Sequence, residues 1–353
     1  MSRGYLVRKI FLTTALFATL SLNAMTPVSA QNLRLTGSGA SFPFPLYSSW
    51  FKDFSKQTQG VTVDYQAKGS GAGIQDFTNN TVDFAASDAA MSDEEIAKIK
   101  QGVVLLPMTA GEIVLSYNLE GVKELRLPRE VYPDIFAGKI ARWNDPKIAA
   151  ANPGVKLPDQ NITVVARSDS SGTTYVFTGH LSAINPAFKS AIGHGTTVQW
   201  PTSFVKAPKN DGVTATIKQT PGAMGYIEYT YAMATKQPMA ILQNKAGQYV
   251  APSDDAGKAA LASAEFTSKT LPGSDAPDLR VWLFDPASPQ AYPIATFTWM
   301  LFYKDQDDAK AKVLRDLVEY GLTKGQAMAP KMGYIPLPDS VIAQVRKAAA
   351  LIQ

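Results

Sequence analysis

Apolar and polar positions along the chain follow two periods, one typical of strands and one typical of helices. Short apolar runs rich in β-branched and aromatic residues predict strands, notably at 61–65, 82–86, 164–166 and 294–303. Apolar residues three and four positions apart predict helices that bury one face, as at Leu46, Trp50 and Phe54. Further helices are expected at 175–184, 212–219 and 256–266, and the chain closes with two amphipathic ones. Strands that alternate with helices predict an α/β fold with largely parallel pairing.

Glycine and hydroxyl residues gather where three of the predicted strands lead into helices. These segments are 36–45, 68–73 and 168–174. Ligand sites in α/β proteins lie at the carboxyl ends of strands, and the unpaired N–H groups and dipole of a helix start favour an anion. One such loop is also what an ordinary turn or a capped helix requires. Three of them together favour an anion site.

Two kinds of charged residue adjoin these loops. Arg167 ends an apolar strand, and its guanidinium matches a tetrahedral oxyanion, while Asp169 could hold that guanidinium in place. Asp88 follows the strand at 82–86, where most aspartates are caps or solvated loop residues. An acid aimed at an anion site makes sense when the anion carries a proton that the acid can accept.

Composition excludes several classes of site. The 353 residues, 45% of them hydrophobic, suffice for two ordinary domains. Cysteine is absent, which excludes disulfides, thiolate metal sites, cysteine nucleophiles and a lipidated N-terminal cysteine. The two histidines, His180 and His194, are expected to be partly exposed, and so few make a catalytic triad or a histidine metal site hard to build. We therefore expect neither a catalytic residue nor a metal.

The N-terminal segment 1–30 has the pattern of a secretory signal peptide. A basic start with Arg3, Arg8 and Lys9 precedes an apolar run at 10–22 and a small-residue end at 28–30. Cleavage is expected near Ala30; an uncleaved membrane anchor is the alternative. Without this segment the formal charge falls from +4 to +1, because it holds three basic and no acidic residues. The mature chain is thus expected in the periplasm, and its nearly neutral surface argues against nucleic acid as a partner.

The loop motifs also resemble a known family. The segments are 37–47 (GSGASFPFPLY), 69–73 (GSGAG), 82–88 (VDFAASD) and 167–174 (RSDSSGTT), with further matches at 210–213 (NDGV) and 221–229 (PGAMGYIEY). Together they are similar to the periplasmic phosphate-binding proteins of bacterial high-affinity phosphate ABC transporters. The resemblance extends from about residue 33 to about residue 345.

The resemblance implies an α/β, two-lobed periplasmic-binding-protein fold of type II, a Venus flytrap with the ligand in the interlobe cleft. Two hinge crossovers are expected near 107–111 and 285–293. Lobe I would comprise 31–108 and 289–353, and lobe II would comprise 109–288. The implied ligand is inorganic phosphate with no cofactor. The implied partners are a membrane ABC permease and its ATPase subunits, with the binding protein itself a monomer.

The resemblance also implies which residues bind phosphate. Carried over position by position, they are Ser41, Phe42 (backbone N–H), Ser70, Asp88, Arg167, Ser171, Gly172 (backbone N–H) and Thr173, with Asp169 orienting the arginine. Three other functions stay open: a secreted phosphatase, a binding protein for sulfate, molybdate or a phosphonate, and an adhesin or matrix role.

Overall fold

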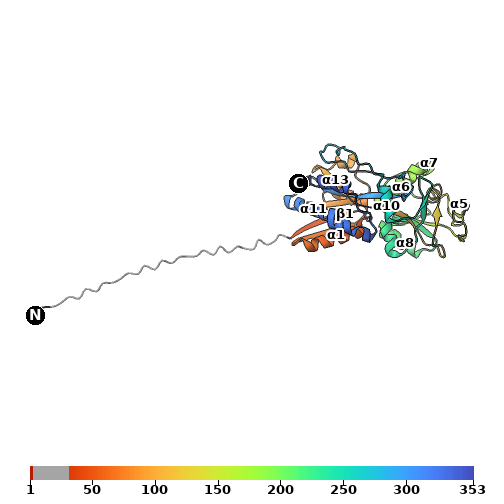
Figure 1. Ribbon diagram of the computed structural model, residues 1–353, viewed down its shortest axis with the longest axis horizontal. Coiled ribbons are helices and arrows are strands. Elements are labelled where there is room, and N and C mark those ends of the chain that lie inside the picture. Colours follow the sequence, from red (N-terminus) through yellow and green to blue (C-terminus); the bar gives the residue numbers. More distant parts are fainter. Residues whose placement is uncertain (3–31) are drawn as a thin grey trace. The chain divides into compact units, whose positions relative to one another are not determined.

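The computed structural model describes residues 1–2 and 32–353, and residues 32–353 form one compact unit (Figure 1). The predicted signal peptide lies outside the described residues except for its first two. Within the described residues, no helix has both the length and the apolar character needed to cross a membrane.

An eight-stranded sheet organises the unit, in the order β2-β1-β3-β11-β4-β8-β6-β7. Its strands are β1 (Leu33–Gly39), β2 (Val61–Ala67), β3 (Phe84–Ser87), β4 (Val103–Tyr117), β6 (Thr163–Arg167), β7 (Val205–Ala207), β8 (Ala223–Glu228) and β11 (Ala295–Tyr303). A small second sheet contains β5 (Arg126–Leu127), β9 (Ile241–Gln243) and β10 (Tyr249–Val250).

The α/β class is confirmed, but the expectation of largely parallel pairing is wrong for the middle of the sheet. β1 pairs in parallel with β2 and β3, and β6 does so with β7 and β8. β11 instead runs antiparallel to both β3 and β4, and β4 runs antiparallel to β8. The local pattern could not show this, because β11 returns from the far end of the sequence to lie between β3 and β4.

Strand β4 joins the two halves of the sheet. All 15 of its residues are buried. Its first part, up to Glu112, pairs with β11, and from Ile113 onward it pairs with β8. The apolar runs at 103–108 and 113–117 are therefore one continuous strand, because the residues between them keep their pairing with β11.

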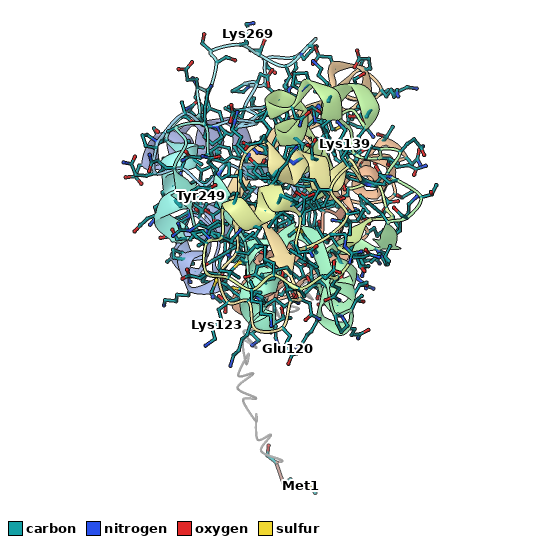
Figure 2. The ribbon with its side chains drawn as sticks, turned by 90° about the vertical axis from the view of Figure 1, so that its right-hand side faces the viewer. Met1, Glu120, Lys123, Lys139, Tyr249 and Lys269 are labelled. Atoms are coloured by element: carbon teal, nitrogen blue, oxygen red, sulfur yellow. The ribbon has the colours of Figure 1, made fainter. Side chains whose placement is uncertain are left out.

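Helices cover both halves of the sheet. Figure 1 shows α1 (Phe44–Gln57), α11 (Asp308–Tyr320) and α13 (Asp339–Ala349) around one half, and α5 (Pro146–Ala150), α7 (Pro186–Ala191) and α8 (Lys209–Gln219) around the other. The remaining α-helices are α2 (Ser70–Thr78), α3 (Asp93–Ile96), α4 (Val131–Phe136), α6 (Gly172–Ile184), α9 (Tyr229–Thr235), α10 (Asp254–Leu261) and α12 (Gln326–Met328). Charged side chains such as Glu120, Lys123, Lys139 and Lys269 lie at the exposed surface (Figure 2).

Capping side chains explain where two helices depart from the prediction. α6 begins at Gly172, before the expected start at 175, because Ser171 Oγ accepts a hydrogen bond from Thr174 N at 3.0 Å. α9 is a helix that the sequence pattern did not predict, and it follows β8 directly because the Glu228 carboxylate accepts from Thr230 N at 3.0 Å. In both places one side chain satisfies the unpaired N–H of a first turn.

His180 is fully buried, contrary to the expectation that it is partly exposed. Its Nδ1 donates to the Phe284 carbonyl oxygen at 2.6 Å, so its Nε2 accepts from the Tyr132 hydroxyl at 2.8 Å. Burial lowers the pKa of His180 to about 4, which keeps the ring neutral. The side chain is thus a structural hydrogen-bonding group that ties α6 to the segment preceding β11.

Candidate functional site

The residues predicted from separate loops lie together at the carboxyl ends of strands β1, β2, β3 and β6. Each of the predicted phosphate-binding residues is buried although it is polar or lies in a loop. The exposed fraction is 5% or less for Ser41, Phe42, Ser70, Asp88, Arg167, Ser171 and Thr173. Buried polar groups need partners, so the hydrogen bonds among these residues define what the site can bind.

Loops from the two halves of the sheet meet at Gly172. A Cβ atom on Gly172 would lie 2.7 Å from Asp88 Oδ2 and still closer to Ser70 Oγ. Nearby, Gly71 N donates to the Ser170 carbonyl oxygen at 3.1 Å. The start of α6 therefore packs directly against the start of α2 and the loop after β3, and only a residue without a side chain fits at position 172.

Asn210, near the start of α8, links the two halves a second time. Its Nδ2 donates to Ser41 Oγ at 3.0 Å and to Thr173 Oγ1 at 3.2 Å, and its backbone N–H donates to Ser41 Oγ at 3.1 Å. Its Oδ1 accepts from Glu228 N at 3.0 Å. The sequence marked Asn210 only as part of a motif match, since an asparagine in the first turn of a helix carries no signal of such a role.

Arg167, which is buried, and Asp169, which is partly buried, form an ion pair. Arg167 Nε donates to Asp169 Oδ1 at 2.8 Å, and an Nη2 hydrogen goes to Oδ2 at 2.6 Å. Although burial alone raises the pKa of Asp169, the hydrogen bonds and charge of Arg167 outweigh it and leave that pKa below the ordinary value. Asp169 Oδ1 also accepts from Lys209 N at 2.9 Å.

The third nitrogen of the guanidinium, Arg167 Nη1, is buried and has no hydrogen-bond partner within the described residues. A buried charged donor left in this way is costly unless an acceptor reaches it. Because Asp169 holds the other edge of the fork, Nη1 has a fixed direction.

The four hydroxyls of the site all serve as acceptors within the protein. Ser41 and Thr173 accept from Asn210, Ser70 Oγ accepts from Asp88 N at 3.2 Å, and Ser171 Oγ accepts from Thr174 N. In the hydrogen bonds of the part of the chain that the structure describes, none of the four donates. Each hydroxyl therefore keeps its O–H available as a donor. The site is rich in donors, which suits a ligand made largely of acceptor oxygens.

Two backbone segments complete the site. Gly172 is the first residue of α6, so its N–H has no acceptor in its own helix. Phe42 lies between β1 and α1, where its carbonyl oxygen accepts from the Tyr334 hydroxyl at 2.7 Å. Its fully buried ring packs edge-on against Tyr334, with the ring centroids 6.4 Å apart. These contacts hold the loop after β1 in place.

Asp88 is the one acidic acceptor among the predicted residues, and it is 1% exposed. Its Oδ1 accepts from Thr298 Oγ1 of β11 at 2.8 Å. Burial raises the pKa of Asp88 to about 7, and the Thr298 hydrogen bond, the charge of Arg167 and Ser70 hold it from rising further. Sequence reasoning missed Thr298, because a threonine inside a β-branched strand is expected on packing grounds alone.

A second acid, Glu228 at the end of β8, is also fully buried. Burial raises its pKa well above the ordinary value, and the charge of Asp88 adds to this. Its carboxylate accepts from the backbone and hydroxyl of Thr230, which bind it to the start of α9. Glu228 therefore stabilises the start of α9 and has a structural role. Sequence analysis did not identify it.

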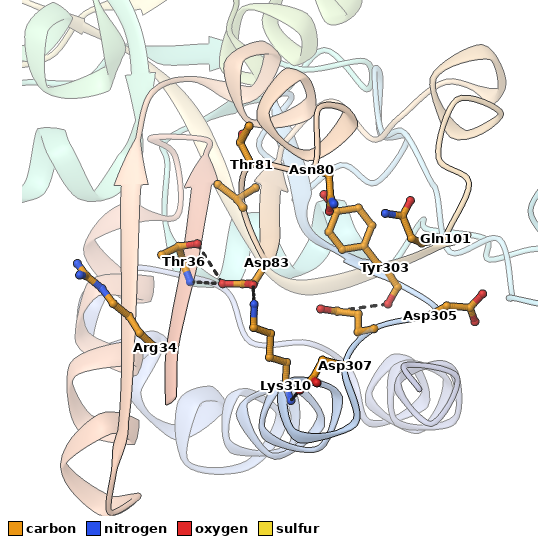
Figure 3. A pocket seen from close by; sticks show the side chains of 12 residues that line it. Arg34, Thr36, Asn80, Thr81, Asp83, Gln101, Tyr303, Asp305, Asp307 and Lys310 are labelled. Atoms are coloured by element: carbon orange, nitrogen blue, oxygen red, sulfur yellow. Dashed lines mark hydrogen bonds and ion pairs between the residues drawn. The ribbon is translucent and has the colours of Figure 1, made fainter. Parts of the chain in front are cut away.

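Another polar pocket lies at the surface of this half of the sheet, away from the predicted residues. It has a volume of about 610 Å³ and is lined by residues from the opposite ends of the strands, among them Thr36, Asp83, Tyr303 and Lys310 (Figure 3). Asp83 accepts there from Thr36 N at 2.7 Å and from Lys310 Nζ at 2.6 Å. Lys310 is thus paired with Asp83, and Asp305 and Asp307 add negative charge to the lining, so this pocket is not the anion site. Among the described residues, no group of three histidine or acidic side chains could hold a metal.

The raised pKa of Asp88 predicts a stability that depends on pH. Because its folded-state pKa of about 7 lies above the ordinary 3.8, the folded protein holds a proton that the unfolded chain releases. The free energy of unfolding should therefore fall as the pH rises from about 4 to about 7, and stay low above that. Each pH unit of that window costs about 1.4 kcal/mol, so the full loss is on the order of 4 kcal/mol.

Urea unfolding of ligand-free protein at pH 5, 6, 7 and 8 measures this loss. Asp88→Asn cannot ionise, so its stability relative to the unaltered protein should grow with pH. A difference between the two proteins that stays constant across this range would contradict the assignment.

Gly172→Ala should destabilise the folded protein by about 1–3 kcal/mol, because the new methyl group must displace Asp88 and Ser70. Gly212→Ala in α8 is a matched control, since its Cβ would lie no closer than 3.2 Å to a neighbouring atom. Alanine also favours a helix over glycine, so the control should be as stable as the parent or more so. Equal urea midpoints for both variants would show that the two loops are not packed as described.

Comparison with known proteins agrees with the motif resemblance. The model of the PBP superfamily domain matches residues 24–323. The phosphate-binding protein PstS of Xylella fastidiosa (strain 9a5c) is 36% identical over 92% of this chain and 87% of its own length. The protein of the same name from Pasteurella multocida (strain Pm70) is 36% identical over 97% of this chain and 95% of its own length.

Solved structures share the fold. A high affinity periplasmic phosphate-binding protein bound with phosphate has a TM-score of 0.72 at 22% identity, over 89% of this chain and 93% of that one. The phosphate-binding protein from Stenotrophomonas maltophilia has a TM-score of 0.67 at 23% identity, with the same coverage. The architecture is thus the α/β two-lobed periplasmic-binding-protein fold.

The family model spans most of the chain, and the two PstS relatives, each 36% identical, match the chain over nearly its whole length. The resemblance inferred from the loop motifs is therefore confirmed, and the chain belongs to the PstS family of phosphate-binding proteins, within the PBP superfamily.

Proposed function

We propose that this chain captures inorganic phosphate and delivers it to an ABC transporter for import. One observation carries the proposal: buried donors surround a single acidic acceptor. Four hydroxyls keep their O–H groups available and Arg167 Nη1 has no partner among the described residues, while Asp88 can only accept when ionised. An anion with several oxygens and at least one proton satisfies both halves of this arrangement. The name carried by the relatives supports the same ligand.

In this proposal one oxygen of phosphate donates its proton to Asp88, and the other oxygens together receive donors from both halves of the sheet. The binding residues are Ser41, Phe42 (backbone N–H), Ser70, Asp88, Arg167, Ser171, Gly172 (backbone N–H) and Thr173. Asp169 does not touch the ligand but fixes the direction of Arg167 Nη1 through its two hydrogen bonds. Because most donors are neutral dipoles, the ligand is held by directed hydrogen bonds rather than by an excess of positive charge.

Asp88 provides the specificity. Phosphate at neutral pH keeps at least one proton and can donate it to the Asp88 carboxylate. Sulfate has none, so its oxygens would face a buried carboxylate without a hydrogen between them. An unpaired buried acceptor and the repulsion between like charges cost several kcal/mol, which is on the order of a thousandfold in affinity.

The lobe limits 31–108 with 289–353 and 109–288 remain part of this proposal, with crossings near 107–111 and 285–293. The change of pairing partner within β4, from β11 up to Glu112 to β8 from Ile113, supports a crossing there. Contacts such as Asn210 with Ser41 join residues assigned to different lobes. Phosphate that binds to both lobes would shift the population toward the closed form, which the transporter would then recognise.

The cellular role follows from the same proposal. The basic and apolar N-terminal pattern supports export through a signal peptide cleaved near Ala30, and so a periplasmic location. The partners would be a membrane ABC permease and its ATPase subunits, and the binding protein would act as a monomer without a cofactor.

Two alternatives receive less support. A phosphatase would need a base to activate a serine, but among the described residues the site serines bond to Asn210, Asp88 N and Thr174 N rather than to a histidine. A binding protein for a fully deprotonated oxyanion would have to accommodate Asp88. We therefore expect no catalysis, and hydrolysis of a chromogenic phosphomonoester by the pure protein would contradict this.

Asp88→Asn should loosen the discrimination against sulfate, because the amide can donate a hydrogen bond to an oxyanion that has no proton. Competition of unlabelled sulfate with labelled phosphate measures the effect, and we expect sulfate to compete at least tenfold better than with the unaltered protein. Asp83→Asn is the control, because Asp83 flanks the other end of the same strand and lies outside the site. If excess sulfate still fails to compete with Asp88→Asn, the role given to Asp88 is wrong.

Arg167→Ala should weaken phosphate binding by roughly tenfold to more than a hundredfold, since a hydrogen bond to a charged group contributes about 1.5–3 kcal/mol. Isothermal titration of refolded, phosphate-free protein should give one phosphate per chain for the parent. Arg142→Ala removes an exposed arginine paired with Asp159 and should leave the affinity unchanged. An Arg167→Ala protein that folds and binds as tightly as the parent would exclude the assigned role.

A further inference from the structure

Strand β11 supplies a buried hydroxyl to the acid of the site. Thr298 is fully buried, and its Oγ1 donates to Asp88 Oδ1 at 2.8 Å across 210 positions of sequence. β11 lies between β3, which leads into Asp88, and β4. Its register against β4 shifts between Thr298 and Trp299.

The hydrogen bond makes the two carboxylate oxygens of Asp88 unequal. Oδ1 is engaged by Thr298, whereas Oδ2 lies beside Gly172, where a Cβ would be only 2.7 Å away. Gly172 begins α6 and belongs to the proposed phosphate site. The ligand's proton is therefore directed to Oδ2, and Thr298 keeps the carboxylate from turning Oδ1 toward the ligand instead.

We infer that Thr298 is a positioning residue that determines anion specificity, by holding Asp88 in the ionised form with Oδ2 directed at the ligand. This inference rests on the proposed phosphate-binding function. A hydroxyl that donates to a carboxylate stabilises the charged form, which a buried site otherwise disfavours. The same bond therefore sets both the protonation state and the orientation of the group that tells phosphate from sulfate.

The surroundings of Asp88 both raise and lower its pKa. Burial raises the pKa of Asp88, and the Thr298 hydrogen bond opposes this more strongly than the charge of Arg167 or the contact with Ser70. One buried acid, Glu228, interacts with Asp88 unfavourably when both are ionised. The remaining titratable groups that sense the charge of Asp88 are tyrosines with raised pKa values: Tyr47, Tyr65, Tyr231 and Tyr334. The tyrosines stay neutral near pH 7, and burial favours the protonated form of Glu228.

Thr298→Val removes the hydroxyl with little change of shape. Without that donor, Asp88 should hold its proton to higher pH and become a donor itself at neutral pH. A protonated Asp88 can donate a hydrogen bond to sulfate, so the variant should bind sulfate up to a higher pH than the parent does and exclude it only above that pH. Thr298→Ser keeps the hydroxyl and should behave as the parent does.

The experiment is sulfate competition against labelled phosphate from pH 6 to pH 9. Parent, Thr298→Val, Thr298→Ser and Asp88→Asn are compared. For Thr298→Val we expect the pH at which sulfate ceases to compete to rise by about one unit or more, which is about a tenfold gain in sulfate competition at pH 9, where Asp88 of the parent is almost wholly ionised. Thr296→Val is the matched control, because Thr296 is equally buried on the same strand but donates to the Phe297 carbonyl oxygen.

A second measurement follows the Asp88 carboxyl itself by carbon-13 NMR in phosphate-free protein, assigned by its absence in Asp88→Asn. The pH midpoint of the Asp88 titration should be higher in Thr298→Val than in the parent. In Thr298→Ser it should equal that of the parent. If Thr298→Val fails to fold, Thr298→Ala is tested by the same two readouts.

The outcomes separate this inference from the proposed function. Should Asp88→Asn admit sulfate while Thr298→Val and Thr298→Ala keep the parent's pH profile and carboxyl midpoint, the role of Thr298 is refuted and the phosphate site stands. Should the parent fail to bind phosphate, or Asp88→Asn leave sulfate excluded, the proposed function itself is at fault.

Discussion

A carboxylate removed from water is the constraint around which this site is built. Asp88 is almost wholly buried, and an ionised acid in such a place requires donors on every side. The fold supplies one of them from β11, through Thr298, and the charge of Arg167 from β6. These supports bring the pKa back to about 7 rather than to the value of a solvated aspartate. The site is thus poised so that a proton shared with a ligand completes it.

Hydrogen bonds within the protein orient the hydroxyls of the site without any ligand. Asn210 donates to Ser41 and Thr173, while the backbone N–H groups of Asp88 and Thr174 donate to Ser70 and Ser171. A hydroxyl whose lone pair is engaged in this way must direct its hydrogen elsewhere. The donors are therefore oriented before binding, which reduces the entropy lost when the complex forms. Helix capping by Ser171 and anion binding at α6 use the same atoms.

The cationic part of the site is restrained in the same manner. Asp169 takes two of the three arms of Arg167, and the ion pair carries little net charge. What remains is one directed N–H, Nη1, rather than a free cation that would attract any anion. A site composed mainly of neutral dipoles with one acid can reject a dianion without protons, whereas a cluster of lysines could not.

Short stretches of sequence determine much of this arrangement. The strand–loop–helix units at 36–45, 68–73 and 168–174 and the two-residue separation of Arg167 and Asp169 depend on neighbours in the chain. Local conformation and charge govern such features, so a reading of residue types finds them. The loop motifs likewise sufficed to identify the family.

Other features depend on contacts between distant segments, and only the folded chain determines them. The mixed order of the sheet, the single strand β4 and the burial of His180 all contradict or extend the local pattern. Thr298 and Asn210 join the site because strand register and helix placement bring them there across 210 and 169 positions. The pKa of Asp88 depends on burial, which is a property of the assembled core. Periodicity specifies which elements form, whereas the packing of those elements decides which side chains meet and how far each is removed from water.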